Sequence, residues 1–189
     1  MKTVLLFPGQ GAQSVGMGRD LHDNSGIARR TFEEADDTLG YPLSQVCFDG
    51  PAERLTRTDV CQPALVAVSV AAWRVAAERG LTGDAVMGHS LGEYSGLVVA
   101  GAIPFATALT LVAERGAAMQ QAADARPGAM AAVLGLDDDA VTALCDEAGD
   151  VWPANFNCPG QVVVSGTPEG VDRVLELAAD SKAKTARLN

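Results

Sequence analysis

A serine between two glycines stands in the stretch Gly88-His89-Ser90-Leu91-Gly92. This G-x-S-x-G pattern follows a short apolar segment and precedes an apolar segment of helical character, the context of a nucleophile elbow. We therefore expect Ser90 Oγ to act as a nucleophile, with the Leu91 N–H directed at a developing oxyanion. The alternative is that Ser90 only caps the helix that follows it.

A second glycine-rich loop, "FPGQGAQ" at residues 7–13, follows another short apolar segment. Its glycines would let the backbone approach a ligand closely, and an amide or N–H of this loop is a candidate second oxyanion donor. The loop is not a P-loop, because no G-K-[ST] follows, and Ser14 replaces the third glycine of a dinucleotide-binding loop. A plain turn between a strand and a helix is the alternative.

Arg115 lies in "LVAERGAAM", among apolar and small residues. A buried arginine must be paired or must await an anion, and its planar fork suits a carboxylate. The sequence therefore suggests a carboxylate-binding role. The alternative is a salt bridge to Glu114, Glu93 or another acidic residue.

A nucleophilic serine needs a base, and the chain has two histidines. His89 directly precedes Ser90, and successive side chains at an elbow point in different directions. We therefore expect it to line the pocket entrance rather than to reach Ser90 Oγ. His22 lies in "GRDLHDN", which is typical of a polar surface. Neither is predicted to be the base.

Composition and net charge exclude some classes of protein. The chain has 189 residues, 48% of them hydrophobic, and a net charge of −10. That charge argues against a nucleic-acid or anionic-membrane partner. The longest apolar run, "PALVAVSVAAW", is stopped by Arg74, so no membrane span is expected. We expect a cytoplasmic protein.

The cysteines form no C-x-x-C pair, which argues against a zinc site. Buried free thiols in a reducing cytosol are expected for all of them. They are Cys47, Cys61, Cys145 and Cys158.

The hydrophobic pattern predicts an α/β fold in two domains. Residues 1–126 are expected to form a hydrolase-like core with a parallel sheet and the elbow. Residues 127–189 are expected to form a small ferredoxin-like α+β subdomain in the order β-α-β-β-α-β. Strands are predicted at 3–7, 84–89, 128–136, 151–157, 161–166 and 183–189, and the first of them is expected to be buried. Helices are predicted at 26–39, 51–55, 62–80, 91–103, 105–124, 137–149 and 167–181. Asp137 and Thr167 are the expected N-caps of the last two helices.

Five motifs occur in order at natural spacing: "FPGQGAQ", "QPAL", "GHSLGEYSGL", "VAERGAAM" and "NFNCPGQVVVSG". On these motifs the chain resembles the malonyl-CoA:acyl carrier protein transacylases of fatty-acid synthesis, over essentially its whole length. The acyltransferase domains of polyketide synthases and the malonyltransferase subunit of malonate decarboxylase share much of the pattern.

The resemblance implies that Ser90 takes a malonyl group from malonyl-CoA. The phosphopantetheine thiol of acyl carrier protein would then attack the malonyl-serine ester. By matching motif, Gln10 and the Leu91 N–H would be the oxyanion donors, and Arg115 would bind the malonate carboxylate. No cofactor or metal is implied.

The same resemblance implies further site residues. Gln62 and Met119 would form pocket wall, and Asn155 and Asn157 would lie on the small subdomain at the cleft. Relatives commonly have serine where this chain has Cys158, and we expect that exchange to be nearly neutral.

In the family the base is a histidine in a loop just after the small subdomain. The chain stops at "AKTARLN", so we expect it to be the N-terminal two-thirds of a transacylase. An exposed apolar sheet edge and face, with low stability or aggregation, is expected to follow. Transfer should be at least about 10²-fold slower than in a complete homologue, because the general base is missing.

The sequence leaves two other classes of function open. A serine esterase would use the same elbow, although a neutral acyl group gives a buried guanidinium nothing to bind. A non-catalytic chain would bind acyl carrier protein, or would be completed by a partner polypeptide. Within the family, a role in polyketide synthesis or in malonate decarboxylation is an alternative to a role in fatty-acid synthesis.

Overall fold

The computed structural model describes residues 2–179, 181 and 183–188. The chain divides into two compact units, unit 1 (Met1–Ala122) and unit 2 (Ala123–Asn189). The boundary predicted from the sequence, between residues 126 and 127, lies four residues further along. Each unit has its own apolar core and is described by itself.

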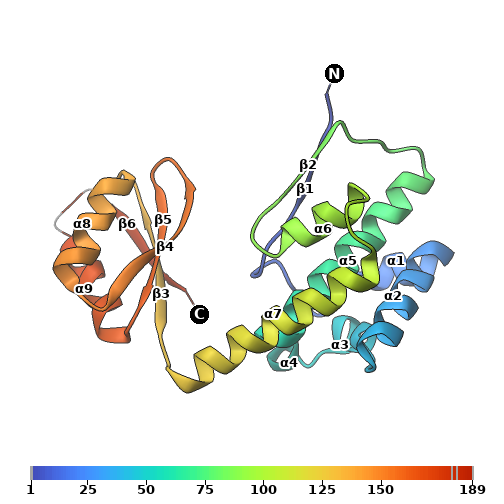
Figure 1. Ribbon diagram of the computed structural model, residues 1–189, viewed down its shortest axis with the longest axis horizontal. Helices are drawn as coiled ribbons and strands as arrows, with labels where there is room; N and C mark the ends of the chain where they lie inside the picture. The colour runs from blue at the N-terminus through green and yellow to red at the C-terminus, as the bar shows by residue number, and fades with distance from the viewer. Residues whose placement is uncertain (1, 180, 182, 189) are drawn as a thin grey trace. The chain divides into compact units, whose positions relative to one another are not determined.

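Unit 1 combines a parallel pair of strands with helices that pack beside it (Figure 1). Its elements are β1 (Val4–Phe7), α1 (Arg19–Asn24), α2 (Gly26–Leu39), α3 (Leu43–Asp49), α4 (Ala52–Thr56), α5 (Thr58–Glu78), β2 (Ala85–Gly88), α6 (Gly92–Val99) and all but the last three residues of α7 (Phe105–Ala125). The short helices α1 and α3 are additions to the elements that the sequence predicts.

The strands β1 and β2 pair in parallel, with Leu6 opposite Met87. Helix α6 packs against one face of the pair, where Phe7 and Val86 lie near Gly96. On the other face Leu6 is 72% exposed and Met87 61% exposed. The prediction that β1 is a buried strand is therefore wrong for one of its faces, whereas the expected exposed apolar face is present.

Helix α5 is the central helix of unit 1. It begins four residues before the predicted start, so Pro63 lies inside it rather than at its beginning. By length and composition α5 is apolar enough to span a bilayer, the one such helix in the described residues, but most of it is buried against neighbouring elements. Arg74, expected to interrupt the apolar run, pairs with Glu34 at 2.7 Å and lies over the Phe105 ring. These contacts fit a core helix.

Unit 2 is an antiparallel sheet with two helices on one face (Figure 1). Its elements are β3 (Ala129–Leu134), α8 (Asp138–Ala148), β4 (Val151–Cys158), β5 (Gln161–Gly166), α9 (Pro168–Ala179) and β6 (Lys184–Leu188). The strand order across the sheet is β4-β5-β3-β6. The last predicted strand included Asn189, which lies outside the described residues.

Both helices of unit 2 begin with the side-chain caps that the sequence predicts. Asp137 accepts a hydrogen bond from the Ala140 N–H at 2.8 Å, and Thr167 Oγ1 accepts one from the Gly170 N–H at 3.0 Å. Each cap satisfies a backbone donor that the first helical turn leaves unpaired.

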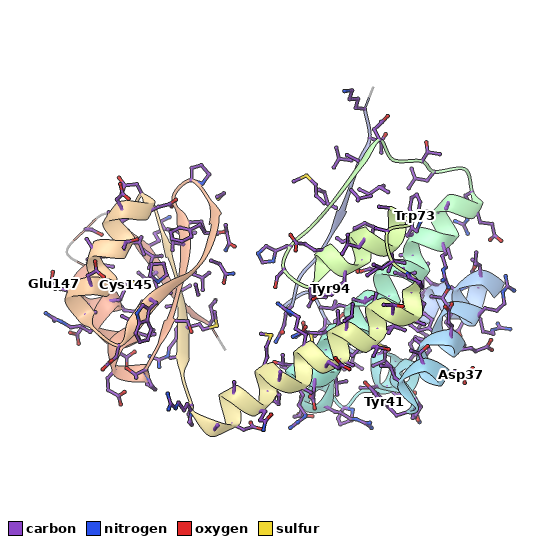
Figure 2. All side chains as sticks on the ribbon, viewed as in Figure 1. Asp37, Tyr41, Trp73, Tyr94, Cys145 and Glu147 are labelled. Atoms are coloured by element: carbon purple, nitrogen blue, oxygen red, sulfur yellow. The ribbon has the colours of Figure 1, made fainter. Side chains whose placement is uncertain are left out.

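The cysteines are all free, but not all of them are buried. Cys145 on α8 faces the core of unit 2, in contrast to the exposed Glu147 two residues on (Figure 2). Cys47 and Cys61 are buried in unit 1. Cys158 is exposed, which corrects the prediction of four buried thiols, because it lies at the end of β4 beside the turn to β5.

Candidate active site

Ser90 occupies a sharp turn between β2 and α6. Its φ is 52°, in the left-handed region that residues other than glycine rarely adopt. Holding a serine there costs on the order of 1–3 kcal/mol, so the surrounding structure must enforce the conformation. The strand, strained turn and helix in the structure match the elbow that the sequence predicts.

The two glycines of the motif are needed because backbone segments cross at van der Waals distance. A Cβ on Gly88 would lie 2.1 Å from the carbonyl carbon of Gly92 and 2.2 Å from the nitrogen of Glu93. A Cβ on Gly92 would lie 2.4 Å from the carbonyl oxygen of Phe7. The elbow therefore folds back on itself at Gly88 and against the end of β1 at Gly92.

The Leu91 N–H is a candidate oxyanion donor. Leu91 precedes the first residue of α6, and its side chain is 1% exposed, which anchors the turn in the core. Among the described residues its N–H has no hydrogen-bond acceptor. An unpaired N–H at the start of a helix is suited to stabilising negative charge.

The glycine-rich loop after β1 lies against the elbow. The His89 N–H donates to the Phe7 carbonyl at 3.1 Å, and a Cβ on Gly9 would lie 2.6 Å from His89 Nδ1. Gln10 is exposed, and its Nε2 donates to Thr58 Oγ1 at 3.2 Å. A primary amide carries two N–H bonds, so this contact leaves a second donor on the same nitrogen.

Arg115 contacts the serine directly. Its Nη2 donates to Ser90 Oγ at 3.1 Å, and its Nη1 donates to Gln62 Oε1 at 2.5 Å. The residue is half-buried rather than fully buried. Within the described part of the chain it forms no ion pair with Glu93 or Glu114. The salt-bridge alternative is therefore wrong for these partners.

Gly116 explains how α7 comes close enough to place Arg115. A Cβ at this position would lie 2.7 Å from the carbonyl oxygen of Thr58 and 2.9 Å from Asp59 Cα, at the start of α5. The Thr58 N–H also donates to Gln120 Oε1 at 3.2 Å. Roles for Thr58, Gly116 and Gln120 are not predicted from the sequence; the glycine directly after Arg115 was the available signal.

Gln62 and Met119 extend the cluster. Gln62 is completely buried, and its Nε2 donates to Met119 Sδ at 3.3 Å. Met119 is 45% exposed. Ser90, Arg115, Gln62 and Met119 are thus joined by a continuous series of side-chain contacts.

The histidines supply no described hydrogen bond to Ser90. His22 is half-buried on α1, with its ring 5.1 Å from the Phe48 ring and its Nδ1 2.9 Å from Asp23 Oδ1. The side chain is 29% exposed, so His22 lies at the surface as expected, but aromatic rings cover part of it. His89 is exposed beside Gly9. Among the described residues no side chain accepts the Ser90 proton.

Two predicted site residues belong to unit 2. Asn155 and Asn157 lie on β4 and are exposed. Their assignment to the site stays a prediction. The described residues contain no group of His, Cys, Asp or Glu side chains arranged to hold a metal ion.

The elbow, the Arg115 guanidinium and the glycine-rich loop lie together in unit 1. A family model described as acyl transferase domain matches residues 4–188. The chain therefore belongs to the acyl transferase family.

Curated relatives of the chain are named for a more specific activity than the family model is. A malonyl CoA-acyl carrier protein transacylase of Bacillus subtilis is 48% identical over 189 residues, which are 98% of this chain and 60% of the relative. The resemblance to malonyl transacylases is thus confirmed. The chain spans about 60% of the length of this curated relative.

Solved structures agree with the fold. An acyl carrier protein S-malonyltransferase from Vibrio cholerae has a TM-score of 0.92 and 46% identity, over 100% of this chain and 63% of that one. A malonyl-transacylase in complex with a type II PKS acyl-carrier protein has a TM-score of 0.91 and 43% identity, over 100% and 62%. The α/β class with parallel and antiparallel sheets is consistent with these structures.

Proposed function

We propose that this chain carries the acyl-accepting site of a malonyl transfer in cytoplasmic fatty-acid synthesis. The malonyl group passes from malonyl-CoA to Ser90 and then to the phosphopantetheine thiol of acyl carrier protein. The observation that carries the proposal is the 3.1 Å contact between Arg115 Nη2 and Ser90 Oγ. It places a permanent cation beside the atom that would accept an acyl group.

In the first half-reaction Ser90 Oγ attacks the thioester carbonyl of malonyl-CoA. The new bond joins Oγ to the carbonyl carbon, the carbon–sulfur bond breaks, and CoA leaves as the thiol. The Leu91 N–H and the second N–H of Gln10 stabilise the oxyanion of the tetrahedral intermediate. The strained φ of Ser90 keeps Oγ presented for the attack.

In the second half-reaction the carrier-protein thiol attacks the malonyl ester, and Ser90 regains its proton. Both halves need a group that accepts and returns that proton. The family resemblance implies a histidine in a loop that follows the small subdomain. The described residues contribute the nucleophile, the oxyanion donors and the cation.

Arg115 gives the site its selectivity for a carboxylated acyl group. A guanidinium binds a carboxylate through two parallel N–H···O bonds, and acetyl has no carboxylate to offer. An esterase for neutral acyl groups would gain nothing from this cation. Its position at the serine therefore favours malonyl transfer over general ester hydrolysis.

The proposal also includes the fold type of each unit and the partners of the chain. The order β-α-β-β-α-β in unit 2 and its strand order β4-β5-β3-β6 support a ferredoxin-like subdomain. The parallel pair of β1 and β2 and the strained turn at Ser90 support a hydrolase-like core in unit 1. The relative solved with an acyl-carrier protein supports such a protein as the acceptor. The net charge of −10 supports the exclusion of nucleic acid and anionic membranes as partners.

A transfer assay tests the proposal. The chain is incubated with malonyl-CoA and acyl carrier protein, and the carrier is examined by intact mass. Malonyl should appear on carrier protein that bears phosphopantetheine and not on the form without it. The expected rate is at least about 10²-fold below that of a complete relative, because no described residue accepts the serine proton. Free malonate with no loaded carrier would favour hydrolysis and overturn the proposal.

A further inference from the structure

Gln62 is a polar side chain with no exposure, on the central helix α5. A buried amide is costly unless its oxygen and nitrogen both find partners. Its Oε1 accepts from Arg115 Nη1 at 2.5 Å, and its Nε2 donates to Met119 Sδ at 3.3 Å. Gln62 thus links α5 to two residues of α7, one helical turn apart.

The chemistry of the partners fixes which way the amide faces. A guanidinium offers only donors, so the end of Gln62 next to Arg115 must be the oxygen. A thioether sulfur is only an acceptor, so the end next to Met119 must be the nitrogen. Both contacts select the same orientation, and the amide cannot flip without losing both of them.

The planar guanidinium of Arg115 connects Gln62 to Ser90. Gln62 holds Nη1, and the other terminal nitrogen, Nη2, is the one that donates to Ser90 Oγ at 3.1 Å. Because the guanidinium is flat and rigid, fixing one terminal nitrogen restricts the direction of the other. The orientation of Arg115 at the nucleophile therefore depends on Gln62, whose described hydrogen bonds go to Arg115 and Met119 and not to Ser90.

We infer that Gln62 is a positioning residue: it orients the Arg115 guanidinium toward the acyl group on Ser90 and thereby sets the preference for carboxylated acyl chains. The inference rests on the proposed function and deepens it. A neutral acceptor is suited to this task because it directs the guanidinium and leaves its charge for the substrate. A glutamate at the same place would direct the guanidinium and neutralise it.

The first arm of the test observes the guanidinium itself. Nitrogen NMR of isotope-labelled arginine side chains is recorded on the whole chain, with Arg115→Lys to assign the signal. Restricted rotation should give separate Nη proton signals for Arg115, and Gln62→Leu should average or broaden them. Gln121→Leu makes the same replacement at an exposed position of α7 and should leave them unchanged. Unchanged signals in Gln62→Leu would overturn the inference.

The second arm measures loading of Ser90 from malonyl-CoA and from acetyl-CoA by intact mass. Gln62→Leu should lower the malonyl-to-acetyl ratio about 10-fold, the effect of losing one hydrogen bond to a charged group. Gln62→Glu keeps the shape of the side chain and an acceptor, so the guanidinium signal should stay ordered while the ratio falls at least as far. A merely structural role would not separate these two readouts.

The outcomes distinguish this inference from the function on which it rests. An unaltered loading ratio in both variants would overturn the selectivity role even if the NMR signals change. If the unaltered chain carries no malonyl on Ser90, the proposed function fails and the selectivity role fails with it. The NMR arm would still decide whether Gln62 orients Arg115. Circular dichroism confirms that each variant is folded.

Discussion

The guanidinium of Arg115 donates a hydrogen bond to the Ser90 hydroxyl at 3.1 Å. Since a guanidinium cannot accept a proton, the hydroxyl oxygen is the acceptor and its own hydrogen points elsewhere. The contact therefore leaves the serine proton available to a base. It also places positive charge beside the oxygen that must become nucleophilic. Arg115 is positioned both to bind a substrate carboxylate and to favour the ionised serine.

Removing the Arg115 guanidinium should affect the loading of Ser90 with malonyl and with acetyl differently. Arg115→Ala is expected to lower malonyl loading of Ser90 by about 10²-fold or more, because a charge-assisted bidentate contact is lost. Acetyl loading should be spared or raised, since acetyl offers no carboxylate. Loading from the two thioesters is followed by mass over time.

Arg115→Lys is the matched control for charge without the planar fork. It should retain part of the malonyl preference, because an ammonium attracts a carboxylate but cannot bind it bidentately. Equal loss of malonyl and acetyl loading in Arg115→Ala would instead mean that the residue supports the elbow, and would contradict the assigned role.

The glycines of α6 give a paired test of the elbow. Gly92→Ala should destabilise the fold by about 1–3 kcal/mol, because the added Cβ would lie 2.4 Å from the Phe7 carbonyl oxygen. Gly96→Ala on the same helix meets nothing closer than 3.7 Å, and should be neutral or stabilising by about 0.5–1 kcal/mol. Urea unfolding of the two variants measures the difference. Similar effects at both positions would contradict the close crossing of β1 and α6.

Much of this arrangement can be predicted from the sequence. The positions of Ser90 and its flanking glycines indicate the elbow, because strand, turn and helix follow one another locally along the chain. The caps at Asp137 and Thr167 are predicted for the same reason, since each depends on a few neighbouring residues. Local patterns of this kind need no knowledge of the tertiary fold.

The remaining features depend on packing between distant segments. The role of Gly116 arises only because the start of α5 crosses α7 there, which no local pattern reveals. The partial covering of His22 follows from the Phe32 and Phe48 rings, which come from two other helices. Likewise, Leu6 is apolar like a core residue yet 72% exposed, because helices cover only one face of its strand pair.

The exposed face of β1 and β2 should cause self-association. Leu6 and Met87 lie opposite each other in the parallel pair and are 72% and 61% exposed. Replacing both with glutamine should increase the monomer fraction in gel filtration, because an open apolar sheet face favours association. Leu111→Gln, at a 42% exposed position of α7, is the control and should change little. Equal gains from the control would indicate a general solubility effect instead.

The thiols should differ sharply in reactivity. Burial raises the pKa of Cys47 to about 12 and that of Cys61 to about 11, so both stay protonated and shielded near neutral pH. Cys158 is exposed. Iodoacetamide at pH 8 should therefore modify Cys158 in the folded chain, and the buried thiols only after unfolding, as read by peptide mass. Equally rapid labelling of Cys47 would contradict its burial.

The same raised pKa values predict the direction of an alkaline effect. Below pH 9, the ordinary pKa of these thiols, both stay neutral in the folded and unfolded chain. As the pH rises from 9 toward 11 and 12, the unfolded chain loses these protons first, so stability should fall through this window. Urea unfolding between pH 8 and pH 11 checks the sign of the change, and rising stability would contradict it.

Ser90 is expected to accept a malonyl group as an ester. The most direct measurement incubates the chain with malonyl-CoA, with imidazole added as an external proton acceptor, and locates the added mass by peptide mapping. One malonyl group is expected, on the peptide that contains Ser90, and none in Ser90→Ala. A malonyl group on any other residue, an adduct that persists in Ser90→Ala, or no adduct at all would contradict it.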